Sequence, residues 1–179
     1  SGVAECAMGT PLRTLIDECS GGPSDGRALI AVLPGASSAV VAASQLDTPL
    51  THEHFAAIGS ALGSAGFRCI DDTNQADDVL ALTHAVSQFL SVESCGQCTP
   101  CKADGLAISA SLEQLLDPAG PAEPGTSPTD DLAALLESVV NEARCSLAAQ
   151  HQTVIRSLLA FDPGAATSDA LRGRSAPMF

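Results

Sequence analysis

Three closely spaced cysteines are the residues of this sequence best suited to bind a metal centre. Cys95, Cys98 and Cys101 follow one another at C-x2-C-x2-C spacing. Because a helix has about 3.6 residues per turn, three residues at this spacing do not share one face of a regular helix. Gly96 permits a positive φ, and Pro100 fixes φ and lacks an N–H, so both favour a tight loop. We expect this loop to gather the three sulfurs around a small inorganic centre.

The sequence also offers a fourth thiol for such a centre. A [4Fe–4S] cube needs four thiolates, so one of them must come from outside the loop. Cys145 is the only cysteine after the loop. The sequence therefore predicts one [4Fe–4S] cluster, bound by Cys95, Cys98, Cys101 and Cys145. It predicts no catalytic residue, because no Ser/His/Asp or Cys/His arrangement can be argued from it.

A structural zinc ion is the main alternative for these four thiols. Zinc sites usually consist of two C-x2–4-C pairs that form two knuckles. Here three cysteines are crowded together and the fourth lies 44 residues after Cys101. This three-plus-one arrangement favours the cube over a single ion. If the thiols held zinc, the chain would be a non-redox interaction module.

The segment around the three cysteines resembles a known signature. The ten residues Glu-Ser-Cys-Gly-Gln-Cys-Thr-Pro-Cys-Lys, from Glu93 to Lys102, resemble the ESCGxCxPCR-x-G signature of the NADH-binding 51-kDa subunit of respiratory complex I. The same signature occurs in the diaphorase subunits of NAD-reducing hydrogenases and NAD-dependent formate dehydrogenases. Lys102 stands where the family usually has Arg, which preserves the charge and loses the guanidinium's planar donor fork. The resemblance covers most of the chain and is highly specific in this motif.

The resemblance implies an electron-transfer role without the rest of the family's machinery. In the family, a β-grasp module called SLBB directly precedes the cluster domain, and a larger α/β domain before it holds flavin and nicotinamide. This chain contains no G-x-G-x-x-G or Walker pattern after a strand, and it begins within the first expected SLBB strand. We therefore expect a cluster but no site for NADH or FMN. Both a stand-alone relay subunit and a fragment of a longer polypeptide fit this expectation.

The first part of the chain has the pattern of a small mixed sheet that packs on one helix. Apolar runs between turn residues predict strands at 28–33, 39–41 and 67–70, and a short strand can form at 1–8. A helix is expected to start at Gly9-Thr10-Pro11-Leu12, with Thr10 as its N-cap. The order of these elements looks like the SLBB module.

From residue 76 the apolar period becomes helical. A first stripe contains Val79, Leu82, Val86, Phe89 and Leu90, and three further helices are expected around 108–116, 128–140 and 154–159. The third of these four helices should carry Cys145 near its C-terminal end. The predicted fold class is α+β, with a β-grasp domain at 1–75, an iron–sulfur-binding four-helix bundle at 76–165 and a tail at 166–179.

Composition limits the partners that the chain can have. The net charge is −13, with 8 basic and 21 acidic residues among 179, and the sequence has no Trp or Tyr. Nucleic acids and anionic membrane surfaces need clustered Lys and Arg, so neither is expected as a partner. No apolar run approaches the roughly 20 residues of a membrane helix, and no signal-peptide pattern is present. We expect a soluble, cytoplasmic protein whose partners are other redox subunits that carry flavin or iron–sulfur groups.

The other cysteines and a histidine pair have simpler interpretations. Cys6, Cys19 and Cys69 are widely spaced among apolar neighbours and are expected to be small buried side chains. His52 and His54 flank Glu53, and a solvated turn is more common for such a pair than a metal site.

Two basic residues stand next to expected cluster ligands. Lys102 follows Cys101, and Arg144 precedes Cys145. Because a four-thiolate cluster is anionic, nearby cations would stabilise its reduced form and raise its potential. An ordinary surface position is an equally good interpretation of both residues.

Overall fold

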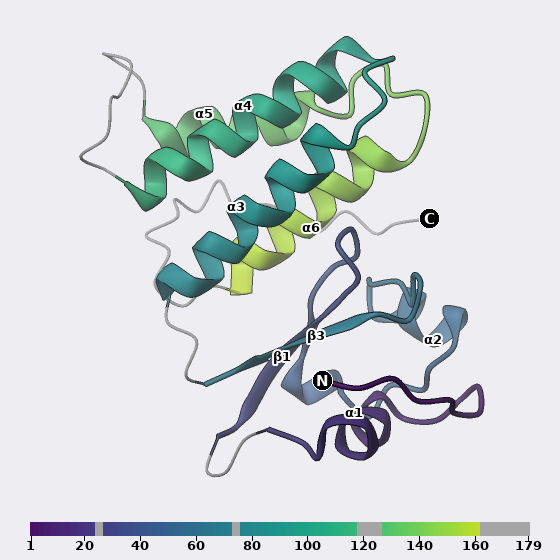
Figure 1. The fold of residues 1–179 in the computed structure, drawn as a ribbon. Helices are drawn as coiled ribbons and strands as arrows, with labels where there is room; N and C mark the ends of the chain where they lie inside the picture. Colours follow the sequence, from purple (N-terminus) through teal and green to yellow (C-terminus); the bar gives the residue numbers. More distant parts are fainter. Residues whose placement is uncertain (24–26, 73–75, 118–126, 162–179) are drawn as a thin grey trace. The chain divides into compact units, whose positions relative to one another are not determined.

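The computed structural model describes residues 1–23, 27–72, 76–117 and 127–161. Contacts divide these residues into two compact units, one that ends with Asp72 and one that begins with Ala76 (Figure 1). The first unit contains a small sheet with short helices, and the second is helical. The predicted mixture of helices with a small sheet is therefore confirmed. The predicted tail at 166–179 lies outside the described residues.

The sheet of the first unit has one central strand. Strand β1 (Leu29–Pro34) lies between β2 (Val41–Ala42) and β3 (Phe67–Asp71), and both pairings are antiparallel. At its middle, Val32 pairs with Val41 on one side and with Cys69 on the other. Most of β1 is buried, as expected for an apolar run that has neighbours on both edges.

Among the described residues of the first unit, three short helices accompany the sheet. They are α1 (Leu12–Ser20), the 3₁₀ helix η1 (Ala43–Gln45) and α2 (His52–Ala57). They pack with the sheet around a core that consists of Leu12, Ile16, Val32, Val41, Leu46, Leu50, Phe55 and Leu62. The rings of Phe55 and Phe67 contact each other at a centroid distance of 6.3 Å. Aromatic and aliphatic burial of this kind supplies most of the stabilisation of a small unit.

Two predictions for the beginning of the chain are wrong. Residues 1–8 form no strand, and Pro11, rather than Thr10, is the N-cap of α1. Pro11 is extended and forms an isolated antiparallel bridge with Pro49, which delays the helix by one residue. The hydroxyl of Thr10 instead donates to the carbonyl of Ala7 at 2.8 Å.

The predicted turn at 52–54 is also wrong, because these residues begin helix α2. Thr51 is its N-cap, and its side chain accepts a hydrogen bond from the backbone N–H of His54 at 3.2 Å. Glu53 lies in the first turn, where a negative charge is favourable. The side chains of His52, Glu53 and His54 are nevertheless exposed, as a solvated segment requires.

The cap of α2 gives a stability prediction. Replacing Thr51 with Ala removes the acceptor for the His54 N–H, so we expect the free energy of unfolding to fall by about 1 kcal/mol. Thr51→Ser keeps the hydroxyl and should lose clearly less. Urea unfolding of the three proteins checks this, and equal stabilities for Thr51→Ala and Thr51→Ser would contradict it.

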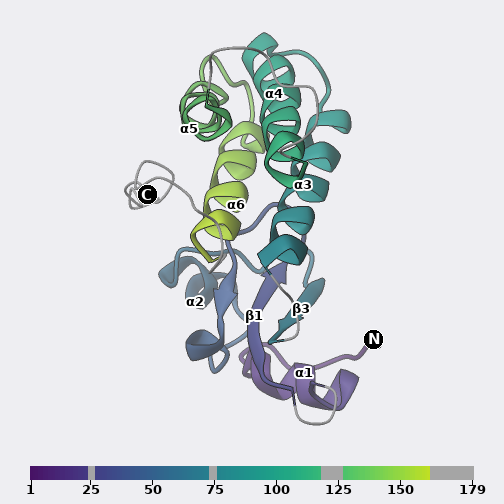
Figure 2. The same cartoon turned by 90° about the vertical axis from the view of Figure 1, so that its left-hand side faces the viewer.

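The described residues of the second unit form four α-helices. They are α3 (Ala76–Val92), α4 (Thr99–Leu116), α5 (Pro128–Ser138) and α6 (Leu147–Phe161). Helix α3 packs on α4 and α6, and α5 packs on α4 (Figure 2). Their shared core includes Val79, Val86, Leu90, Ile108, Leu112, Leu132, Leu136, Val154, Ile155, Leu158 and Leu159. In the described ranges of the chain, no helix combines the length and the apolar character needed to cross a membrane.

One residue of the predicted stripe on α3 is misplaced. Phe89 is 52% exposed, whereas Thr83, Ser87 and Ser91 are buried. The buried face of α3 therefore includes small polar residues that allow close packing against α4. Because the prediction used only apolar residues, it placed the buried face of α3 too close to Phe89.

Candidate metal centre

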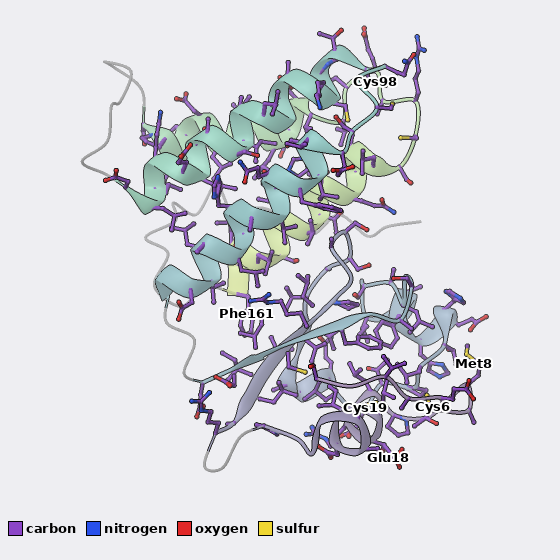
Figure 3. All side chains as sticks on the ribbon, viewed as in Figure 1. Cys6, Met8, Glu18, Cys19, Cys98 and Phe161 are labelled. Carbon is purple, nitrogen blue, oxygen red and sulfur yellow. The ribbon has the colours of Figure 1, made fainter. Side chains whose placement is uncertain are left out.

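Two of the predicted ligands lie in the short loop between α3 and α4. This loop, residues 93–98, contains Cys95 and Cys98, and Figure 3 shows Cys98 at one end of the helical unit. Gly96 has a φ of +73°, the left-handed conformation that its position in a tight loop was predicted to need. Cys101 is not in the loop, because α4 begins at Thr99 and takes Pro100 into its first turn. The loop is thus shorter than predicted, since proline also suits a first helical turn.

The fourth predicted ligand, Cys145, lies in a different place from the one expected. Helix α5 ends at Ser138, and Cys145 occupies the connection to α6, two residues before that helix begins at Leu147. Glu142 has a φ of +55°, which is incompatible with a continued helix. The prediction that α5 carries Cys145 near its end is therefore wrong, although the connection still brings this cysteine to the same site.

Polar contacts fix the helices on both sides of the 139–146 connection. The hydroxyl of Ser138 donates to the carboxylate of Asp104 on α4 at 2.6 Å. The amide of Gln152 on α6 donates to the carbonyl of Leu136 on α5 at 2.5 Å. The first bond links the end of α5 to α4, and the second links α6 to α5, so both helices that flank the connection are fixed.

The two cysteine-bearing segments meet. The backbone N–H of Arg144 donates to Sγ of Cys98, with 3.4 Å between nitrogen and sulfur. The pKa of the Cys101 thiol is raised by burial and, after that, by the neighbouring thiols of Cys98, Cys145 and Cys95. The four cysteines that the sequence singled out therefore lie on three neighbouring segments, the 93–98 loop, the first turns of α4 and the connection from α5 to α6.

This donor set fits a positively charged iron centre. Burial is the main cause of the raised pKa of the Cys101 thiol, and repulsion from the neighbouring thiolates adds to it. A cationic metal centre relieves that repulsion. In the described part of the chain, no group of three or more His, Cys, Asp or Glu side chains is arranged to hold a single metal ion. A zinc ion at about 2.3 Å from each of four sulfurs would need those sulfurs roughly 3.8 Å apart. A cube takes four thiolates, so these four cysteines are a donor set that suits a cluster.

The ammonium of Lys102 interacts with the end of a helix as well as with a thiol. Its ammonium donates to the carbonyl oxygens of Ser91 at 2.6 Å and Val92 at 3.1 Å, at the C-terminal end of α3. It also lowers the pKa of the Cys101 thiol, against the larger effects that raise it. Lys102 is thus neither a free surface cation nor one directed only at the thiols.

A buried network of hydroxyls and one imidazole lies between the helices, and sequence reasoning missed it. Ser87 Oγ lies 2.9 Å from Nε2 of His151 and 2.9 Å from Oγ of Ser109, and Ser91 Oγ lies 3.4 Å from Ser109 Oγ. His151 is 3% exposed, and burial lowers its pKa to about 4. A Cβ on Gly105 would lie 3.0 Å from Ser91 Oγ, so this glycine permits the close approach of α3 and α4. The sequence indicates this network only through its small residues, the three serines and Gly105, on two helices that face each other.

The remaining cysteines are in the first unit. Cys6 and Cys69 are exposed and Cys19 is half-buried, so the expectation that all three are buried is wrong. Cys69 illustrates the reason. It lies on β3, where residues alternate between two faces, and its neighbour Ile70 is the one that is buried.

Comparison with known proteins agrees with this site. Residues 81–162, which include all four cysteines, match the family described as the NADH-ubiquinone oxidoreductase-F iron-sulfur binding region. This segment of the chain is similar to the iron–sulfur binding region of that family. The resemblance found in the cysteine signature is therefore confirmed, and with it the iron–sulfur character of the region.

The similarity to named relatives extends beyond residues 81–162. The second F-type subunit of the NADH-quinone oxidoreductase of Rhizobium meliloti (strain 1021) is 35% identical over 82% of this chain and 33% of its own length. The HndC subunit of the NADP-reducing hydrogenase of Solidesulfovibrio fructosivorans is 32% identical over 82% of this chain and 29% of its own length. The chain thus spans about a third of the length of these relatives.

A solved structure is also similar. A chain of the NAD⁺-reducing [NiFe]-hydrogenase in the H₂-reduced state superposes with a TM-score of 0.66 at 25% identity. The match covers 86% of this chain and 24% of that chain. Its extent includes most of the described residues, so the similarity is not confined to the cysteine segment.

Proposed function

We propose that the chain is an electron-transfer subunit or domain of a multi-subunit oxidoreductase, with one [4Fe–4S] cluster bound by Cys95, Cys98, Cys101 and Cys145. The observation that carries this proposal is the meeting of two separate segments, where the backbone N–H of Arg144, next to Cys145, donates to Sγ of Cys98. Such a cluster, when bound, supplies a one-electron redox centre. The protein's own residues hold the thiols and donate a backbone N–H to one of them.

The proposal includes an assignment of the two units. We assign residues 1–75 to an SLBB-like β-grasp domain, 76–165 to a four-helix bundle that holds the cluster, and 166–179 to a tail. The antiparallel sheet with α1 packed on its core supports the first assignment. Four helices with a shared apolar core support the second.

The proposed partners are other redox subunits. The relatives are named as subunits of NADH-quinone oxidoreductase and of an NADP-reducing hydrogenase. No dinucleotide-binding glycine pattern occurs in the 179 residues. We therefore assign the flavin and NADH chemistry to other polypeptide segments, and we propose a cytoplasmic location for the assembly.

Metal analysis of the purified chain separates this proposal from the zinc alternative. Anaerobically prepared protein should be brown and contain about four iron and four sulfide per chain, as one cube requires. A colourless protein with one tightly bound zinc would instead identify a structural site made of four cysteines. That outcome would replace the electron-transfer role with a non-redox interaction module.

A further inference from the structure

The C-terminal end of α3 is held by a side chain from the next helix. The last carbonyls of any helix lack partners within that helix. In α3, the ammonium of Lys102 donates to two of them, at 2.6 Å from Ser91 O and 3.1 Å from Val92 O. The hydroxyl of Ser94 donates to the same Ser91 carbonyl at 2.8 Å. One lysine on α4 thus supplies hydrogen-bond donors to two of the last carbonyls of the preceding helix.

The contact between Lys102 and the end of α3 joins the two sides of the loop that contains Cys95 and Cys98. Residues 93–98 leave α3 after Val92, and α4 begins at Thr99. Lys102 lies in the opening turns of α4, where its backbone N–H donates to the carbonyl of Cys98 at 3.0 Å. One residue therefore contacts the last residue of the loop through its backbone and the end of α3 through its side chain.

We infer that Lys102 is a positioning residue that fixes the cysteine loop and so slows the loss of bound iron. This inference rests on the proposed iron–sulfur function. The bonded ammonium is favourable at the C-terminal end of α3, where the helix dipole is negative. Because two carbonyls hold it, the cation also keeps one position beside Cys101.

The experiment compares Lys102→Met with Lys102→Arg and with a matched loss of charge at the other ligand. Arg144→Met is that control, because it removes a cation next to Cys145 but keeps the backbone N–H that contacts Cys98. Each protein is loaded anaerobically with iron and sulfide, and the rate of iron loss to a chelator is measured. Hydrogen exchange of residues 93–98 is measured in the iron-free proteins.

For Lys102→Met we expect iron loss at least tenfold faster than in the unsubstituted protein, and faster exchange in the loop. Lys102→Arg should remain within about threefold, because a guanidinium keeps the charge and can donate to both carbonyls. Arg144→Met should lose iron at close to the unsubstituted rate. If Lys102→Met cannot be loaded at all, faster exchange of its loop still supports the inference, and unchanged exchange overturns it.

Two results would distinguish a failure of the positioning role from a failure of the proposed iron–sulfur function. If the unsubstituted protein takes up no iron and sulfide, the proposed function itself fails. If it takes them up and Lys102→Met releases iron no faster, the function stands and the positioning role is wrong. If Lys102→Met and Arg144→Met accelerate iron loss equally, the effect comes from charge alone, and the positioning role is again wrong.

Discussion

Replacing Cys145 with Ser should abolish the intact cluster and leave the two units folded. The substitution removes one of four proposed thiolates and changes little volume, so its main effect is on the metal. We expect iron to fall from about four per chain to three or fewer, because one iron of a cube loses its protein ligand. Iron and sulfide analysis, with visible and electron paramagnetic resonance spectra, measures this directly.

The matched control for Cys145 is another exposed cysteine. Cys69 is exposed on β3 in the first unit and is not among the thiols that raise the pKa of Cys101. Cys69→Ser should therefore keep the full iron content and the same spectra. A normal cluster in Cys145→Ser would mean that the fourth ligand has been assigned to the wrong residue.

Most of the candidate site could be proposed from the sequence because three of its four cysteines lie in one short segment. The spacing of Cys95, Cys98 and Cys101 and the conformational freedom of Gly96 are properties of one short segment. A fourth ligand could be proposed because Cys145 is the only later cysteine. Its position in the fold could not, because Glu142 ends the helical path in a left-handed conformation that sequence patterns do not favour for a glutamate.

Other features depended on contacts between distant segments. An apolar stripe suggested that Phe89 faces the core, but Ser87 and Ser91 do so, because Gly105 on α4 lets the helices approach closely. Likewise, the bridge between Pro11 and Pro49 decides where α1 begins. Small or polar residues are buried when their partners are present, and a single sequence does not reveal those partners.

The buried imidazole of His151 should make the helical unit sensitive to acid. Burial lowers its pKa to about 4, so the folded protein keeps it neutral at neutral pH. The unfolded chain binds a proton at an ordinary histidine pKa of about 6.5. The stability that neutral His151 contributes is thus present above that pH and is lost as the pH falls toward 4.

The expected magnitude follows from the difference between the two pKa values. Between pH 7 and pH 5, titration of His151 should lower the free energy of unfolding by about 2 kcal/mol. His151→Gln has no titrating group there but keeps a polar side chain beside Ser87, so this part of the pH dependence should disappear. The measurement is urea unfolding at both pH values, with the two proteins in the same state of iron loading.

The matched control for His151 is the other histidine described in the same unit. His84 lies on α3, is half-buried, and is not part of the network of Ser87, Ser109 and His151, so His84→Gln removes a histidine from the same unit and leaves that network unchanged. Acidic groups that titrate in this range are common to all three proteins and cancel in the comparison. If His151→Gln loses as much stability as the unsubstituted protein, burial does not hold His151 neutral, and the acid sensitivity has another source.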